Sequence, residues 1–206
     1  MGRGVCRDVL TSQLSDRTDD VAVLLAFNGV VALTACADFS GLQVNGVDAK
    51  ARVSLPAVFR QVIDLRLSGG EIPDGLQRSI KIGKHPRLPC LEAFDPTYVA
   101  VVKETTRERA KIKAEAEGLF AGDVYDDLIS RVLGRMHDVS YDGTGRMVLP
   151  AGLKAKAGIG DDAVFLGAGD VFRIWSPDNF RTEHADDPDL VDDMELALGA
   201  RKGGRG

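Results

Sequence analysis

Val47-Asp-Ala-Lys-Ala-Arg-Val-Ser-Leu-Pro-Ala-Val-Phe-Arg60 is the stretch that decides the fold, because it occurs twice. Its second copy begins 94 residues later and reads Tyr141-Asp-Gly-Thr-Gly-Arg-Met-Val-Leu-Pro-Ala-Gly-Leu-Lys154. The two copies share the aspartate, the arginine four residues after it, and the Leu-Pro-Ala run. A duplication of this kind indicates two similarly folded units in one chain.

A second pair of matching segments follows the two copies. Leu91-Glu-Ala-Phe-Asp-Pro96 parallels Phe172-Arg-Ile-Trp-Ser-Pro177 at an offset of 81 residues, so the first copy holds 13 extra residues. We expect these extra residues in the stretch 68–89, which is punctuated by glycine and proline.

The local signals come in the same order in both units. A turn at Asp-x-x-x-Arg precedes a short strand, a proline opens a helical turn, and one or two further strands follow. Residues 163–166 and 171–175 are short apolar runs on either side of a Gly-rich turn, which is typical of a β-hairpin. A unit with so few strands cannot bury its own apolar face. We therefore expect the two units to pair into one pseudo-symmetric β core, with Phe172 and Trp175 inside it.

The residues between the units predict two helices, over 97–117 and 123–136. An apolar stripe at fourfold spacing supports the second helix: Val124, Leu128, Val132 and Met136. A basic stripe on the first helix alternates with glutamates: Lys103, Arg107 and Lys111. We interpret this stripe as a solvated face rather than as a surface that follows DNA phosphates.

The charge of the chain restricts the kind of nucleic-acid site that it can carry. With 26 Lys+Arg and 31 Asp+Glu the net charge is -5. A general polyanion-binding surface is excluded, and any nucleic-acid site must be a local patch. Residues 48–87 carry eight basic and four acidic side chains, a net charge of +4. The best candidate for such a patch therefore lies in the first unit.

Cysteine and histidine residues are too scattered to predict a metal or redox site. Cys6, Cys36 and Cys90 lack the C-x-x-C spacing of zinc sites, and we expect them to be reduced thiols. No nucleophile–base pair and no cofactor loop is recognisable. We therefore predict no metal, no cofactor and no enzymatic activity.

The first 38 residues lie outside both repeats. Residues 21–37 are apolar and contain Leu33-Thr-Ala-Cys36, which resembles a lipoprotein cleavage box. However, Asp16, Asp19 and Asp20 stand where an export signal should be positively charged. We expect residues 1–38 to be a disordered extension of a cytoplasmic protein with no membrane span; export is the alternative.

The duplicated motif resembles the MraZ family of transcription regulators, as do Phe39-x-Gly41 and a closing aromatic strand that ends in Trp175. The resemblance spans about residues 39–180. It implies an α+β fold with linker helices. In this fold, tandem AbrB-like swapped-hairpin units form a pseudo-symmetric double-split β-barrel. The resemblance also implies that several protomers form a closed ring. The implied parts are a first SpoVT-AbrB-like unit (39–97), a helical linker (98–135) and a second unit (136–180). The excess of acidic side chains over 181–206 indicates an acidic C-terminal tail, in which Leu190, Met194 and Leu198 could form a short amphipathic helix after Pro188.

The resemblance also implies a function and its residues. Members regulate division and cell-wall genes at the nucleoid, through short G-rich direct repeats of double-stranded DNA upstream of those genes. Carried over position by position, Arg52 and Arg146 match the DNA-binding arginines of the motif. Asp48 and Asp142 match its aspartates. Two further positions belong to one copy each: Lys50 as a DNA contact, where the other copy has Thr144, and Gly145 as a support of the turn, where the other copy has Ala51.

The chemistry of the motif agrees with this role. An arginine fork can bond guanine O6 and N7 together, which is worth about 1–3 kcal/mol of base discrimination. An aspartate four residues earlier can hold the fork through a charge-assisted hydrogen bond. The alternative is that the aspartates only cap turns and the arginines form ion pairs. If the position before the arginine needs a positive φ, Ala51 strains the first turn in a way that Gly145 does not strain the second.

Two other functional classes remain open from the residues alone. An oligomeric scaffold that does not bind DNA would use the duplicated β module equally well. An antitoxin-like AbrB module shares the hairpin, but usually has one copy of it. The paired arginines and the net-positive window favour the DNA-binding regulator.

Overall fold

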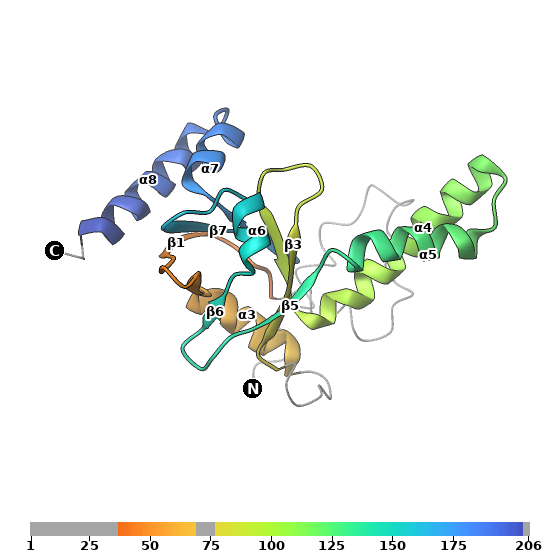
Figure 1. Cartoon of the computed structure of the whole chain (residues 1–206), viewed down its shortest axis with the longest axis horizontal. Coiled ribbons are helices and arrows are strands. Elements are labelled where there is room, and N and C mark those ends of the chain that lie inside the picture. The colour runs from red at the N-terminus through yellow and green to blue at the C-terminus, as the bar shows by residue number, and fades with distance from the viewer. Residues whose placement is uncertain (1–36, 69–76, 204–206) are drawn as a thin grey trace, which may run out of the picture. The chain divides into compact units, whose positions relative to one another are not determined.

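The structure is a computed structural model that describes residues 37–68 and 77–203 (Figure 1). The elements follow in this order: β1 (Leu42–Gly46), β2 (Arg52–Ser54), α3 (Ala57–Leu67), β3 (Ser79–Lys84), β4 (Leu91–Phe94), η2 (Pro96–Tyr98), α4 (Val99–Glu117), α5 (Ala121–Leu133), β5 (His137–Ser140), β6 (Arg146–Val148), α6 (Ala151–Lys156), β7 (Asp162–Ala168), β8 (Val171–Trp175), α7 (Pro177–Glu183) and α8 (Pro188–Gly203). The prediction of mixed α and β structure is confirmed.

The described strands form one antiparallel sheet and one separate ribbon. The sheet has six strands in the order β1-β7-β8-β4-β3-β5, and β2 pairs only with β6. The sheet is open, with β1 and β5 at its edges. Within the described residues the strands therefore do not close into the predicted barrel.

The two halves of the chain exchange strands across a pseudo-twofold axis. β1 from the first half pairs with β7 from the second, and β5 from the second half pairs with β3 from the first. Equivalent positions of the repeat face each other in two places: Val53 opposite Met147, and Glu92 opposite Arg173. When a twofold axis passes between two copies of a segment, each residue beside the axis pairs with its own equivalent in the other copy. The strand register thus has the symmetry that the duplicated sequence predicts.

The main core lies where the ribbon, the sheet, α3 and α6 meet. Val53 and Met147 from the ribbon are buried together with Leu55, Leu149 and four phenylalanines. The Phe39 ring packs against Phe172 and Phe59 with centroids 5.0 Å and 5.4 Å apart. Phe172 and Trp175 are fully buried, as predicted.

A second core lies between the sheet and the C-terminal helices. Val164 and Trp175 of the sheet pack with Phe180 of α7 and Met194 of α8. Arg201 near the end of α8 forms an ion pair with Asp162 at the start of β7. Much of the stretch expected as an acidic tail is therefore helix held against the sheet.

The extra residues of the first repeat lie partly in a longer helix. α3 spans 11 residues, whereas its counterpart α6 spans six. The expectation that the insertion falls entirely within 68–89 is therefore wrong, because part of it extends α3 before that stretch begins.

α4 and α5 lie side by side as a helical hairpin with a small core of its own (Figure 1). Ala110 and Ala114 of α4 pack against Val124 of α5. The basic stripe of α4 forms exposed ion pairs with neighbouring glutamates, between Arg107 and Glu104 and between Lys111 and Glu108. The stripe is therefore exposed to solvent, as expected, and its lack of a role in DNA binding stays a prediction.

The expectation of disorder for the N-terminal extension falls almost entirely on residues 1–36, which lie outside the described residues. Among the helices that are described, none is long and apolar enough to span a membrane.

Arg66 of α3 fastens the beginning of the described chain to the rest of the fold. Its side chain is 1% exposed and bonds the carboxylate of Asp95, which is 0% exposed, at 2.9 Å. Its Nε donates to the Ala37 carbonyl at 2.8 Å, and Nη1, which also bonds Asp95, donates to the Asp170 carbonyl at 2.9 Å. The guanidinium also lies over the Phe39 ring, 4.8 Å from its centroid. One buried cation thus joins four separate segments.

We expect Arg66→Ala to lower the free energy of unfolding by about 3–5 kcal/mol, because it leaves the buried Asp95 carboxylate without its cationic partner. Urea unfolding of the full chain measures this loss. Arg131→Ala, which breaks the exposed pair with Asp127, is the control and should cost less than about 1 kcal/mol. Equal losses in the two variants would show that the Arg66 network does not stabilise the fold.

Candidate nucleic-acid interface

The ribbon of β2 and β6 has one buried face and one open face. Val53 and Met147 point inwards and are 2% and 1% exposed. Alternate residues of a strand point to opposite faces, so Arg52 and Arg146 lie together on the other face. On that face Arg52 is opposite Val148, and Arg146 is opposite Ser54. The structure therefore brings the two predicted arginines onto one surface.

The first turn is held by the carboxylate of Asp48. Its Oδ1 accepts the backbone amides of Lys50 at 2.8 Å and Arg52 at 2.9 Å. Its Oδ2 accepts the Nε of the Arg52 side chain at 2.6 Å. Asp48 thus caps the turn and also bonds the arginine side chain. The Lys50 side chain is exposed beside them.

The second turn has the same backbone but a different side-chain arrangement. Oδ1 of Asp142 accepts the amides of Thr144 at 2.8 Å and Arg146 at 3.0 Å. Its third donor is the Thr144 hydroxyl, at 2.6 Å. No ion pair between Asp142 and Arg146 is found among the described residues, and Arg146 is exposed. Here the aspartate caps the turn without holding the arginine.

Both aspartates are ionised at neutral pH. Hydrogen bonds lower the pKa of Asp48 below 3.8, the largest contribution coming from the Arg52 amide. The pKa of Asp142 is also lowered, chiefly by the Thr144 hydroxyl. Because these values are lower in the folded than in the unfolded chain, the stability they contribute is fully present above pH 3.8. This contribution to stability is lost only as the pH falls through the pKa values that the two aspartates have in the folded chain.

Each turn is tied to the other half of the chain. The Leu55 amide donates to the Gly145 carbonyl at 2.8 Å, and the Leu149 amide donates to the Ala51 carbonyl at 2.9 Å. These two bonds are equivalent under the pseudo-twofold axis. The residue before each arginine is therefore fixed by a backbone bond from the opposite repeat.

The position before each arginine has a left-handed backbone. Gly145 has a φ of +84°, and Ala51 has a φ of +58°, which makes Ala51 the one non-glycine residue with positive φ in the described chain. The strain that the sequence predicted for the first turn is confirmed. A Cβ on Gly145 would also stand 2.9 Å from the Leu55 carbonyl oxygen and 2.7 Å from Nε of Arg60.

Two residues contribute to the site that sequence reasoning did not assign to it. Arg60 at the start of α3 crosses to the second turn, where its Nη1 donates to the Gly143 carbonyl at 3.2 Å. Thr144 gives its hydroxyl to the motif aspartate. Both copies of the repeat have a basic residue at this position, Arg60 and Lys154, and this shared charge could have indicated a role for Arg60. Thr144 carried no comparable signal.

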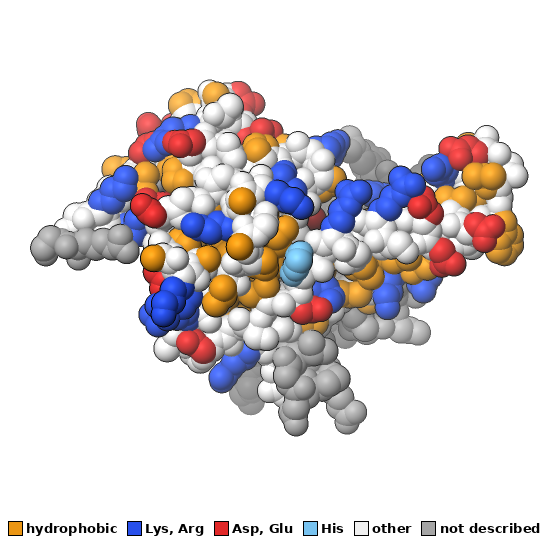
Figure 2. Space-filling view, in the orientation of Figure 1, with side chains coloured by type: hydrophobic (Ala, Val, Ile, Leu, Met, Phe, Trp, Pro, Cys, Tyr) orange, Lys and Arg blue, Asp and Glu red, His pale blue; other side chains and the backbone are white. Residues whose placement is uncertain are grey.

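Basic side chains gather around the first turn. Figure 2 shows them at the place where Figure 1 draws the connection from β1 to β2, with hydrophobic side chains on the neighbouring surface. Val148, which is 54% exposed, supplies part of that apolar surface on the open face of the ribbon. The surface thus combines guanidinium groups with an exposed aliphatic group.

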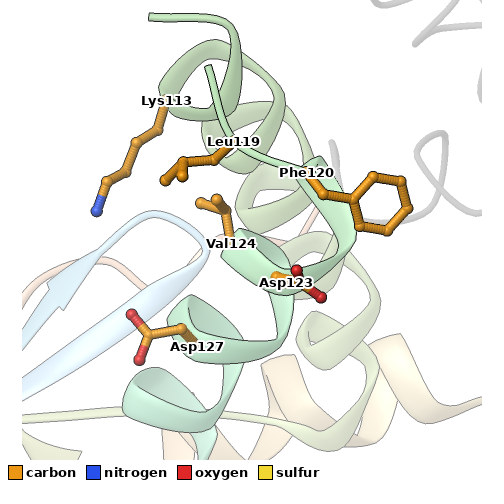
Figure 3. Close-up of a pocket in the computed structure, with 6 residues that line it drawn as sticks. All are labelled: Lys113, Leu119, Phe120, Asp123, Val124 and Asp127. Atoms are coloured by element: carbon orange, nitrogen blue, oxygen red, sulfur yellow. The ribbon is translucent and has the colours of Figure 1, made fainter. Parts of the chain in front are cut away.

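A shallow pocket lies on the helical hairpin and includes none of the motif residues. It has a volume of about 220 Å³ and is lined by side chains from the end of α4, the connection between the helices and the first half of α5. Figure 3 shows Leu119 and Val124 close together, whereas Phe120 points away from them. Asp123, Asp127 and Lys113 complete the lining.

No group of His, Cys, Asp or Glu in the described part of the chain is placed to hold a metal ion. Cys90 is buried, and burial raises the pKa of its thiol to about 12. At neutral pH this thiol is therefore protonated and a poor metal ligand.

Comparison with known proteins decides the family. Residues 132–189 match the family described as "MraZ protein, putative antitoxin-like". A "Transcriptional regulator MraZ" from Rickettsia akari is 34% identical over 142 residues, which are 69% of this chain and 83% of the relative. The chain belongs to the MraZ family. The resemblance predicted from the duplicated motif is confirmed.

Other members of the MraZ family show similar identity. The protein of the same name from Ruegeria pomeroyi is 33% identical over 150 residues, covering 70% of this chain and 81% of its own length. The one from Rickettsia bellii is 31% identical over 154 residues, covering 75% and 91%. Because these relatives are named as regulators of transcription, membership of the MraZ family also confirms the prediction that the chain is not an enzyme.

We expect opposite effects on stability from exchanging alanine and glycine in the two turns. Ala51→Gly should raise the free energy of unfolding by about 0.5–1 kcal/mol, because the left-handed strain that it removes exceeds the entropy cost of glycine. Gly145→Ala should lower it by about 2 kcal/mol or more, since the new Cβ meets the Leu55 carbonyl as well. Urea unfolding measures both. An unchanged stability of Gly145→Ala would contradict the close approach of this position to the Leu55 carbonyl oxygen.

Proposed function

We propose that this protein is a sequence-specific DNA-binding regulator of transcription, in which the open face of the β2–β6 ribbon enters the major groove. The observation that carries the proposal is the placement of both motif arginines on that one face. The major groove admits a two-stranded β-ribbon. The curated relatives are named as regulators of transcription, which supports the same function.

The geometry of the ribbon suits the spacing of base pairs. Arg52 and Arg146 occupy diagonal positions of an antiparallel pair, which places the two residues about 7–8 Å apart and their Cβ atoms somewhat closer. Base pairs are stacked about 3.4 Å apart along the helix axis. The two arginines can therefore reach positions about two base steps apart. Val148 lies on the same face, where a thymine methyl group is a suitable contact.

The targets that we propose are short, guanine-containing direct repeats upstream of division and cell-wall genes, so that the protein acts at the nucleoid in the cytoplasm. Lys50 adds a contact from the first turn. In this proposal residues 39–97 and 136–180 are two SpoVT-AbrB-like units, and 98–135 links them. The exchange of strands between the two halves supports a swapped-hairpin arrangement of these units.

We also propose that protomers assemble into a ring. β5 is a sheet edge, and unpaired strand edges favour association. The helical hairpin exposes large apolar side chains, with Ile112 69%, Leu119 54% and Phe120 74% exposed. In a ring, several ribbons engage several DNA repeats together, which raises the affinity of a protomer with few contacts.

Replacing either motif arginine should weaken promoter binding while the fold is retained. We expect Arg52→Ala and Arg146→Ala each to remove about 1–3 kcal/mol of binding free energy per engaged turn. The measurement is a titration of the full chain with DNA from upstream of its own gene, at fixed salt. Lys103→Ala on α4 is the control and should bind as the parent does. If both arginine variants bound as tightly as the parent, the turns would not be the DNA-binding elements.

The assembly can be tested separately from DNA binding. We expect light scattering at micromolar concentration to give a mass of several protomers, because the open edge and the apolar hairpin favour association. The same mass is expected for Arg52→Ala and Arg146→Ala. A stable monomer in the parent protein would rule out the ring.

A further inference from the structure

The aspartates of the two turns take different side-chain partners. Asp48 accepts Nε of Arg52 at 2.6 Å. Asp142 instead accepts the Thr144 hydroxyl at 2.6 Å. Within the described residues the guanidinium of Arg146 has no hydrogen bond or ion pair. Between aspartate and arginine the turns differ at three positions, Ala49/Gly143, Lys50/Thr144 and Ala51/Gly145. Of these, only Thr144 supplies a side-chain donor to the aspartate.

Holding Nε prepares Arg52 to meet a base. The bond to Asp48 leaves both terminal nitrogens of the guanidinium available and restricts their direction. Guanine offers two adjacent acceptors in the major groove, O6 and N7, which match this fork. A side chain that is already oriented loses less conformational freedom when it binds. The first turn is therefore suited to the recognition of a base.

The second turn offers positive charge without a fixed direction. Arg60 reaches it through the Gly143 carbonyl. Arg78 is also close, since its Nη1 would lie 3.6 Å from a Cβ on Gly143. Arg146 is exposed and not held by Asp142. Phosphate oxygens accept charged donors from many directions and carry no sequence information directly, so this turn is suited to the DNA backbone.

We propose that the two turns of one protomer divide the work on DNA: Arg52, held by Asp48, reads a guanine through O6 and N7, whereas Arg146 binds the phosphate backbone. Asp48 is then a positioning residue that acts through Arg52. Thr144 gives Asp142 another side-chain partner, and Asp142 does not hold the Arg146 guanidinium. This inference rests on the proposed function and specifies which arginine determines sequence specificity.

The first test removes one acceptor from the base. Full-length protein is titrated with duplexes carrying its own upstream repeats, with guanine or with 7-deazaguanine, which lacks N7. The parent should bind the 7-deazaguanine duplex about fivefold or more weakly. Arg52→Ala should bind both duplexes equally, whereas Arg146→Ala should keep the parent's preference. An equal preference in the two variants, or the reverse assignment, would overturn the division of work.

The second test uses salt. Each phosphate contact contributes about one unit to the slope of log affinity against log salt concentration. Arg146→Ala should therefore flatten this slope by about one unit per engaged turn, and Arg52→Ala should leave it unchanged. A flatter slope in Arg52→Ala alone would contradict the proposal.

The third test isolates the positioning role of Asp48 with a matched pair of variants. Asparagine keeps an oxygen that can accept the turn amides, but it loses the charge that holds the guanidinium. Asp48→Asn should reduce the preference for natural guanine roughly twofold to tenfold, and Asp142→Asn should not change it. In an Arg52→Ala background, Asp48→Asn should have no further effect. A further loss there, or no loss in the parent background, would refute a role through Arg52.

These outcomes separate the inference from the proposed function. If neither arginine variant changes the affinity for any duplex, the ribbon does not bind DNA and both proposals fail. If both variants weaken binding with the same response to 7-deazaguanine and salt, the ribbon binds DNA and only the division of work fails.

Discussion

The reciprocal pairing of β2 with β6 is the constraint on which the rest of the structure depends. Each strand has three residues, too few to be stable alone. They are fixed because Leu55 donates to Gly145 and Leu149 donates to Ala51 across the pseudo-twofold axis. The same pairing buries Val53 against Met147. Each turn is therefore held by the other half of the chain in addition to the bonds to its own aspartate.

This constraint also determines which charges reach the surface. Because the inward positions of the ribbon are filled by apolar side chains, both motif arginines face outwards on one side. The net charge of +4 over residues 48–87 overstated the positive charge that is available for DNA on the open face of the ribbon. Arg66 belongs to that window but is buried against Asp95, and Lys81 pairs with Asp138. Burial and pairing, rather than the charge count, distinguish an interface arginine from a structural one.

The pseudo-symmetry is close in the backbone and incomplete in the side chains. Both turns have the same capping bonds and the same left-handed residue before the arginine. They differ at the residue two positions after the aspartate, and this difference accompanies a change in the partner of the carboxylate. A duplicated unit can in this way keep one architecture while its copies take on different contacts. The strained Ala51 and the relaxed Gly145 are a second such difference.

The sequence alone determined the duplication, the pairing of the two units, the buried Phe172 and Trp175 and the membership of the MraZ family. These follow from local motifs and from apolar patterns, which a linear sequence records. It also indicated strain at Ala51, since a glycine occupies the matching position. Only the tertiary structure decided that the sheet is open, that the C-terminal helix α8 packs against the sheet, and that Arg60 reaches the second turn. Those outcomes depend on contacts between distant residues, such as Arg60 and Gly143. Whether Asp142 bonds Thr144 or Arg146 depends on directions of side chains that only the folded ribbon sets.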